Sequence, residues 1–120
     1  MEEKSLLSIT RKDGVAIVAF QNSSISDLEE ITAASKQINE FISQNRPKRV
    51  IFDFGGVKFF CSRVLGMLLE MRAKLEEYGG EVVISAINPQ LYRVFKITNL
   101  DKIFKFFPDR KSAVKMMSAG

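Results

Sequence analysis

The chain opens with two short apolar stretches separated by a turn sequence. Residues 6–10 and 15–20 have the apolar pattern of β-strands, and Lys12-Asp13-Gly14 lies between them. Asp-Gly is favoured in tight hairpin turns, because both of its positions tolerate positive φ. The sequence therefore predicts an antiparallel hairpin, followed by a polar loop.

A helix is predicted next, because apolar residues recur with a period of about 3.6. Its expected inner face comprises Leu28, Ile31, Ser35, Ile38 and Ile42, widened by Ala34 and Phe41. Ser26 and Glu29 have the spacing of a capping box, in which the serine side chain binds the first turn of the helix. Asn45 and Pro47 are expected to end the helix.

The middle of the chain combines a buried strand with the start of a second helix. Residues 49–54 are almost continuously apolar, which is typical of a central strand covered on both faces. Gly55 and Gly56 follow, and Ser62 stands where a helix to about Tyr78 should begin. A serine there lies near unpaired backbone N–H groups and the positive end of the helix dipole, so it suits a cap, an anion site or a phosphorylated residue. The expected inner face of this helix is Val64, Leu65, Leu68, Met71 and Leu75.

The last third of the chain predicts two more strands and two more helices. Residues 81–85 are rich in β-branched side chains and predict a short strand. Asn88-Pro89 should begin a third helix, with asparagine as its N-cap. The expected inner residues of this helix are Leu91, Val94, Phe95 and Thr98, with Asn99 at its left-handed end. Residues 103–107 predict an edge strand, and Asp109 should cap a terminal helix through Met117.

The order of these elements predicts the fold class. Strands alternate with helices after the opening hairpin, and this alternation requires crossover connections between parallel strands. We therefore expect an α/β fold with a mixed, mostly parallel sheet of about five strands and about four helices. No linker or repeat interrupts residues 1–120, so a single domain is expected.

Composition narrows the chemistry that the chain can perform. The 120 residues include one cysteine and no histidine, which removes the commonest general base and metal ligand. A lone cysteine forms no intramolecular disulfide, and no secretory or membrane-spanning stretch is visible, so a cytoplasmic location is expected. We expect no enzyme activity, no metal and no cofactor.

The residues that could suggest catalysis or nucleotide binding do not have the spacing of the known motifs. Gly55 and Gly56 belong to neither a phosphate-binding loop nor a dinucleotide fingerprint. Cys61 lies near a helix start, but phosphatases that use such a cysteine need an arginine six positions later, where this chain has Met67. Cys61 is therefore interpreted as a small residue packed at a turn. Asp53, at the end of the central strand, is interpreted as a loop cap in preference to a ligand group.

The net charge of +4 is unevenly distributed. Residues 93–115 contain seven Lys or Arg against Asp101 and Asp109. Such an edge can bind nucleic acid or an acidic protein, although a solvated surface is the simpler interpretation. The aromatic cluster at residues 104–107 has the composition of a single-strand nucleic-acid site, but Phe at alternate strand positions is more typical of a core, so nucleic acid is not expected as a partner.

A resemblance to a known family rests on motifs around the second helix. Residues 50–57 form an apolar strand and an Asp-x-x-Gly-Val turn, and the next motif is Cys61-Ser62-Arg63-Val64-Leu65-Gly66. Together they resemble the signature of the STAS domain, the sulfate transporter and anti-sigma factor antagonist family, in which Asp-Ser-[Ser/Thr]-Gly-Leu-Gly opens the helix. Residues 95–104 and 107–114 are similar to the family's last helix–strand segment and its final turn and helix. The resemblance spans essentially the whole chain and is strongest to single-domain bacterial anti-sigma factor antagonists.

The resemblance implies a phosphoprotein that regulates transcription by binding another protein. In that family, the unphosphorylated antagonist binds an anti-sigma factor, often itself a serine kinase, and sigma factor is released. The kinase then phosphorylates the antagonist, and a phosphatase resets it. By position, the phosphorylated residue is Ser62, and the implied partner-binding residues are Cys61, Ser62, Arg63, Gly66 and Met67.

The chain departs from the signature beside the serine. Cys61, Arg63 and Val64 stand where the family has aspartate, a second hydroxyl residue and glycine. Two alternatives to a switch at Ser62 therefore stay open. In the first alternative, Ser62 would be an N-cap in a STAS scaffold that is not phosphorylated. In the second, the chain would be a transporter-associated subunit that assembles a complex.

Overall fold

The computed structural model of the chain describes residues 6–118. Its elements are β1 (Leu7–Lys12), β2 (Val15–Phe20), β3 (Ser24–Ile25), α1 (Leu28–Asn45), β4 (Arg49–Asp53), β5 (Phe59–Phe60), α2 (Arg63–Glu76), β6 (Glu81–Ser85), α3 (Pro89–Ile97), the 3-10 helix η1 (Leu100–Lys102), β7 (Lys105–Phe107) and α4 (Arg110–Ser118). The predicted order of strands and helices is confirmed. The short strands β3 and β5, and the 3-10 helix, are additions that the sequence did not predict.

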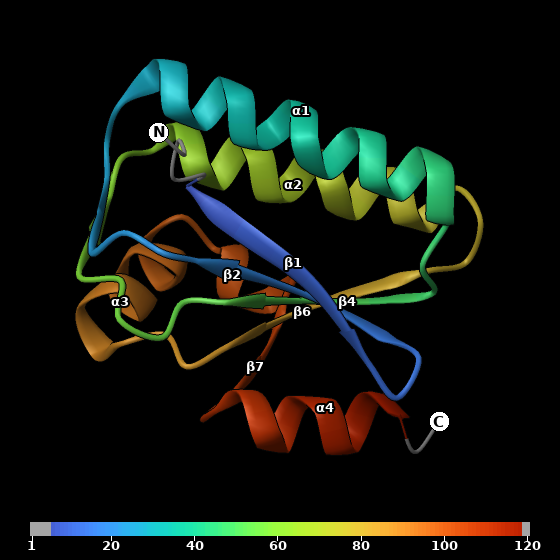
Figure 1. The fold of residues 1–120 in the computed structure, drawn as a ribbon. Helices are drawn as coiled ribbons and strands as arrows, with labels where there is room; N and C mark the ends of the chain where they lie inside the picture. The colour runs from blue at the N-terminus through green and yellow to red at the C-terminus, as the bar shows by residue number, and fades with distance from the viewer. Residues whose placement is uncertain (1–5, 119–120) are drawn as a thin grey trace.

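Within residues 6–118, the main sheet has five strands in the order β1-β2-β4-β6-β7 (Figure 1). β1 and β2 are antiparallel, and the other three neighbouring pairs are parallel, as predicted. The hairpin turn places Asp13 at φ 53° and Gly14 at φ 79°, the two positive values that a two-residue hairpin loop requires. β4 lies in the centre of the sheet, and its residues Ile51 and Phe52 are fully buried.

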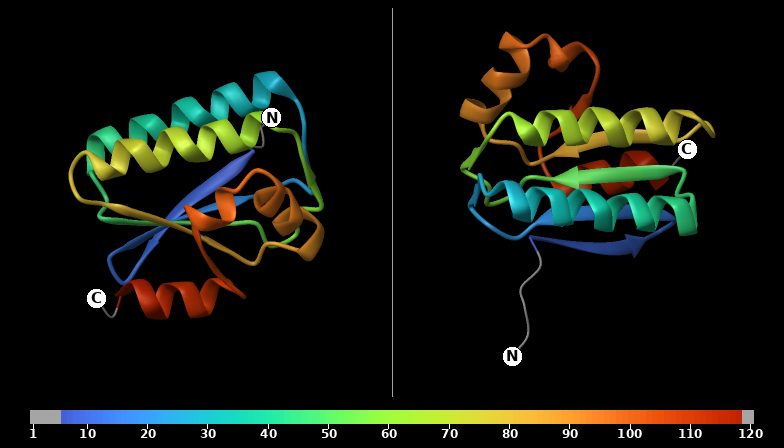
Figure 2. Two further views of the ribbon diagram at one scale, coloured as in Figure 1. Left: turned by 180° about the vertical axis from the view of Figure 1, so that it is seen from behind. Right: turned by 90° about the horizontal axis from the view of Figure 1, so that it is seen from above.

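The helices cover the two faces of the sheet unequally. α1 and α2 lie side by side on one face and run in the same direction, whereas α4 covers the opposite face (Figures 1 and 2). Because successive strand residues point to opposite faces, Phe52 belongs to the large core on the α1–α2 side and Ile51 to the smaller cluster on the α4 side. Within the described part of the chain, no helix combines the length and the apolar character needed to cross a bilayer.

The capping residue of α1 differs from the prediction. Asp27, and not Ser26, caps the helix: its Oδ1 accepts hydrogen bonds from the backbone N–H groups of Glu29 (2.9 Å) and Glu30 (3.2 Å). Asp27 has the last extended conformation before the helix, at φ −79° and ψ 116°, so its side chain is the one aimed at the first turn. The capping-box prediction for Ser26 is therefore wrong by one residue.

The predicted caps of the last two helices are confirmed. The Asn88 Oδ1 accepts from the N–H of Leu91 at 2.9 Å, and the Asp109 Oδ1 accepts from the N–H of Ser112 at 2.7 Å. Asn99 has the predicted left-handed conformation, at φ 62°.

Three predicted positions are wrong in detail. Leu28 is 58% exposed, because it is the first residue of α1 and the buried stripe begins one turn later. Thr98 is exposed at the end of α3, where its hydroxyl donates to the carbonyl oxygen of Val94 at 2.8 Å. The last strand has three residues in place of the predicted five, since the 3-10 helix η1 and the turn after it occupy the preceding residues.

Candidate functional site at the start of helix α2

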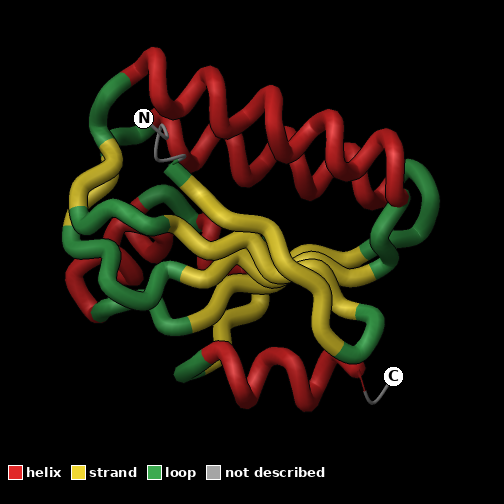
Figure 3. Tube along the Cα trace, in the orientation of Figure 1, coloured by secondary structure: helices red, strands yellow, loops and turns green. Residues whose placement is uncertain are grey.

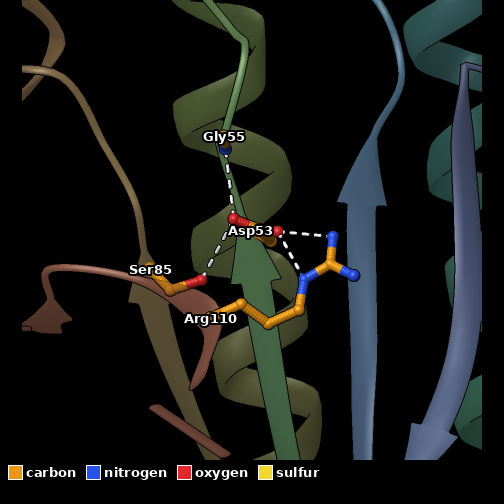
Figure 4. A network of polar contacts seen from close by, with 4 residues as sticks. All are labelled: Asp53, Gly55, Ser85 and Arg110. Atoms are coloured by element: carbon orange, nitrogen blue, oxygen red, sulfur yellow. Dashed lines mark hydrogen bonds and ion pairs between the residues drawn. The ribbon is translucent and has the colours of Figure 1, made fainter. Parts of the chain in front are cut away.

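Asp53 anchors the corner between β4 and the segment that leads to α2. Its Oδ1 accepts from the backbone N–H of Gly55 at 3.1 Å and from the Ser85 hydroxyl at 3.2 Å. Its Oδ2 accepts from the Nε of Arg110, the first residue of α4, at 2.6 Å (Figure 4). Asp53 is 6% exposed, and an unpaired carboxylate at such a site would be costly. These contacts support the loop-cap interpretation, because both carboxylate oxygens already hold the corner together.

The glycine pair turns the chain after Asp53. Gly56 has φ 88°, a conformation that side chains other than glycine's rarely adopt. The N–H of Val57 donates to the carbonyl oxygen of Phe54 at 3.0 Å and closes the turn. The side-chain amide of Asn88 donates to the Val57 carbonyl oxygen at 3.0 Å, so the N-cap of α3 also supports this turn.

A two-stranded parallel ladder then brings the starts of α1 and α2 together. Ser24 pairs with Phe59 and Ile25 with Phe60, at a distance from the main sheet (Figure 3). The N–H of Cys61 continues the ladder by donating to the Ile25 carbonyl oxygen at 3.0 Å. The segments entering the two helices therefore run side by side.

Phe60 packs this ladder against the core, whereas its neighbour Phe59 faces solvent. The Phe60 ring is 6% exposed and lies 5.7 Å from the Phe54 ring and 6.0 Å from the Phe95 ring, with edge-to-face geometry in both pairs. Phe59 is 52% exposed. The segment that presents Ser62 is thus fixed on one side and open on the other.

Ser62 occupies the N-cap position of α2 without capping the helix through its side chain. Its backbone is already helical, at φ −59° and ψ −20°, and its hydroxyl makes no capping hydrogen bond. The N–H groups of Val64 and Leu65 donate to the carbonyl oxygens of Cys61 and Ser62, each at 3.0 Å. Because the backbone satisfies these donors, the exposed Ser62 hydroxyl is left available to another molecule.

The structure distributes the other predicted site residues between surface and interior. Arg63 and Gly66 are exposed on the same helix as Ser62, within its first turns. Cys61 is partly buried and packs against the core, as its sequence context predicted. Met67 is 5% exposed, so the structure brings Ser62, Arg63 and Gly66 together at the surface and places Met67 beneath them.

A groove of about 600 Å³ separates α1 from α2 next to these residues. Ile31 and Met67 are buried at its base, and Lys36, Arg63 and Gly66 also line it. Sequence reasoning missed this groove, and it missed the Asp53–Arg110 pair, whose members lie 57 residues apart. The signal available was the position of Asp53 at the carboxyl end of a central strand, where side chains from distant segments meet.

The aromatic run at residues 104–107 packs against the core. Phe104 is buried, and Phe106 and Phe107 each pack against one of the two core clusters, so this aromatic run belongs to the interior. Among residues 6–118, no three His, Cys, Asp or Glu side chains gather in a group that could hold a metal ion.

Comparison with known proteins defines the class of the chain. The family model of the STAS domain matches residues 7–113, so the chain belongs to the STAS domain family. It is 26% identical over 111 residues to BtrV of Bordetella bronchiseptica, a protein named as a candidate anti-sigma factor antagonist, with 89% of this chain and 90% of BtrV covered. It is 23% identical over 78 residues to the anti-sigma F factor antagonist of Paenibacillus polymyxa, covering 65% of this chain and 67% of the relative.

Solved structures show the same fold. An anti-sigma-factor antagonist (STAS) domain protein from Planctomyces limnophilus superposes with a TM-score of 0.82 at 18% identity, covering 92% of this chain and 96% of that one. The Bacillus protein SpoIIAA, in its phosphorylated form, superposes with a TM-score of 0.72 at 16% identity, covering 92% and 98%. The predicted STAS-like fold is therefore confirmed.

Proposed function

We propose that this protein is an anti-sigma factor antagonist whose binding to an anti-sigma factor is ended by phosphorylation of Ser62. The observation that carries the proposal is the Ser62 hydroxyl itself, which is exposed at the start of α2 and is not used to cap that helix. An anti-sigma factor as the partner is supported by two relatives: the Paenibacillus polymyxa protein is named as an anti-sigma F factor antagonist, and BtrV as a candidate anti-sigma factor antagonist. The anti-sigma factor in this proposal is also the serine kinase, a phosphatase reverses its action, and the exchange takes place in the cytoplasm.

Electrostatics supports a switch at this position. Phosphorylation adds about −1.5 to −2 charges at neutral pH to one point of the surface. The first turn of α2 contains no acidic residue, so the new phosphate meets the positive end of the helix dipole without repulsion from a carboxylate of that turn. The modified protein therefore stays folded, and the charge acts on the docked partner, whose surface was complementary to a neutral hydroxyl.

A non-phosphorylated scaffold is the second candidate function, and Arg63 favours it. Arg63 is exposed directly after the serine, where the family signature has a small hydroxyl residue. A bulky cation at this point changes the surface that a kinase must recognise. Val64, which replaces the glycine of the signature, is fully buried and leaves the exposed surface unchanged.

Incubation with the purified anti-sigma factor kinases of the same organism and ATP separates the two candidates. We expect the intact mass to increase by one phosphate group, and peptide mapping to place that group on Ser62. Ser62→Ala should abolish the increase, whereas Ser24→Ala, at an exposed serine in the neighbouring strand β3, should leave it unchanged. An anti-sigma factor that binds the protein tightly but never phosphorylates it would favour the scaffold.

A further inference from the structure

Gly66 is a glycine that the protein's own structure does not require. It lies inside α2, where glycine costs about 0.5–1 kcal/mol relative to alanine. A Cβ atom built on Gly66 meets no neighbouring atom within 4 Å, so no neighbouring group excludes the methyl side chain of alanine. Its φ is not among the positive values found at Gly14, Gly56 and Gly79. Neither packing nor backbone conformation therefore explains a glycine at this position.

The position of Gly66 suggests an explanation outside the chain. Gly66 lines the groove between α1 and α2, and the absence of a side chain leaves the backbone of α2 bare at this point. Glycine allows the closest approach of another backbone. Ile31 and Met67, buried at the base of the groove, give it an apolar floor.

The charges around the groove are arranged asymmetrically. Arg63 and Lys36 are exposed, and neither forms an ion pair with any described residue. Glu70, further along α2, already accepts a hydrogen bond from the Asn39 side chain at 3.1 Å, and Lys74 donates to the same asparagine at 3.0 Å. The unpaired positive charge of Arg63 thus lies at the end of the groove nearest Ser62, and that of Lys36 lies further along the groove, on α1.

We propose that the groove between α1 and α2 receives an acidic helix of the anti-sigma factor. The helix lies with its backbone against Gly66, and a carboxylate of the partner pairs with Arg63 and Lys36. Helices that bind in grooves use flanking charges to fix their register, and Arg63 and Lys36 supply such charges here. The inference rests on the proposed function, because it specifies how the same partner is bound.

The sharpest test uses Gly66→Ala, because this change should stabilise the folded free protein and lower its affinity for the partner. In the free protein we expect the melting temperature to rise by about 2–5 °C, since alanine is the better helix former. With the purified anti-sigma factor, titration calorimetry should show binding weakened by about tenfold, because the new Cβ occupies the space of the partner backbone. Gly66→Leu should weaken binding further.

Ala33→Leu is the matched control for added bulk. Ala33 is exposed on α1 and does not line the groove, so this change should leave the dissociation constant unaltered. Arg63→Glu tests the charge, and Arg93→Glu, at an exposed arginine of α3, is its control. In the partner, the acidic residue that pairs with Arg63 can be exchanged for lysine. This exchange should restore binding of the Arg63→Glu variant and should not restore binding of the Gly66 variants.

The outcomes separate this inference from the function beneath it. A wild-type protein that binds none of the organism's anti-sigma factors overturns the proposed function, and the groove proposal with it. A wild-type protein that binds one, with Gly66→Ala and Gly66→Leu binding equally well, leaves the function standing and overturns the groove proposal. Loss of binding by Gly66→Ala, together with a raised melting temperature and an unaffected Ala33→Leu, supports it.

Discussion

Helices α1 and α2 begin next to each other, yet their first turns are completed in different ways. In α1, the Asp27 carboxylate accepts two backbone hydrogen bonds, and Glu29 and Glu30 add negative charge. In α2, the backbone closes the first turn on itself, no acidic residue follows, and the Ser62 hydroxyl is left unengaged. The side chain at the start of α1 thus stabilises the fold, whereas the one at the start of α2 is available for a partner.

Among the α-helices of residues 6–118, α2 is the exception. α3 and α4 both begin with side-chain caps, from Asn88 and Asp109. A hydroxyl at the N-cap position is ordinarily a stabilising group. The Ser62 hydroxyl makes no capping hydrogen bond, and the proposed switch depends on this free hydroxyl.

The largest expected effect comes from the residue that holds both helix starts in place. Phe60→Ala should lower the free energy of unfolding by about 3–5 kcal/mol, because it removes a buried ring between two other rings. Phe59→Ala, at its exposed neighbour, should change the free energy by no more than about 0.5 kcal/mol. Urea denaturation of both variants measures the difference, and equal losses would contradict the one-sided attachment of this segment.

Asp27→Ala tests the capped helix of the pair. The variant leaves the N–H groups of Glu29 and Glu30 without their acceptor, and we expect a loss of about 1 kcal/mol. Urea denaturation measures it. Ser26→Ala is the control, since Ser26 does not cap the helix, and a larger loss there than at Asp27 would restore the capping box that the sequence suggested.

Ser62→Ala tests the uncapped helix. Because the hydroxyl makes no capping bond, the free energy of unfolding should change by less than about 0.5 kcal/mol, and alanine's helix propensity can make the change favourable. Denaturation under the same conditions as Asp27→Ala gives a direct comparison. A loss as large as that of Asp27→Ala would show that Ser62 is a structural cap after all.

The smallest expected effect is a pH dependence at the start of α4. The backbone N–H of Ser112, and secondarily its side chain, lower the pKa of Asp109 below its usual 3.8. A lowered pKa in the folded state stabilises the fold above pH 3.8, and that contribution is lost as the pH falls through the folded-state value. Asp109→Asn keeps the cap without the charge. Its stability deficit at neutral pH should therefore vanish in strong acid, and a deficit that persists there would contradict the assignment.

Much of the fold could be predicted because its signals are local. Asp13-Gly14 and Asn88-Pro89 specify their turn and helix start within two residues, and the continuous apolar run before Asp53 identifies the central strand. The choice between Ser26 and Asp27 as the cap of α1 depends on which residue is extended, and the sequence does not determine this. Leu28 fits the helical period, but its exposure depends on where the core ends.

The features that organise the candidate site are contacts between distant segments. The β3–β5 ladder has two residues per strand, too few for any periodicity to show. The Asp53–Arg110 pair and the α1–α2 groove join elements that only the folded chain brings together. Ser62 was identified from a motif, whereas the freedom of its hydroxyl depends on hydrogen bonds between backbone groups.

The most direct test of the central claim is the affinity of one anti-sigma factor for two forms of this protein. Protein phosphorylated stoichiometrically on Ser62 and unphosphorylated protein should be titrated in parallel, with Ser62→Ala as the unmodifiable control. We expect the phosphorylated form to bind at least about tenfold more weakly, because the added charge meets a surface that fits a neutral hydroxyl. Equal dissociation constants for the two forms would contradict the claim that Ser62 is the switch.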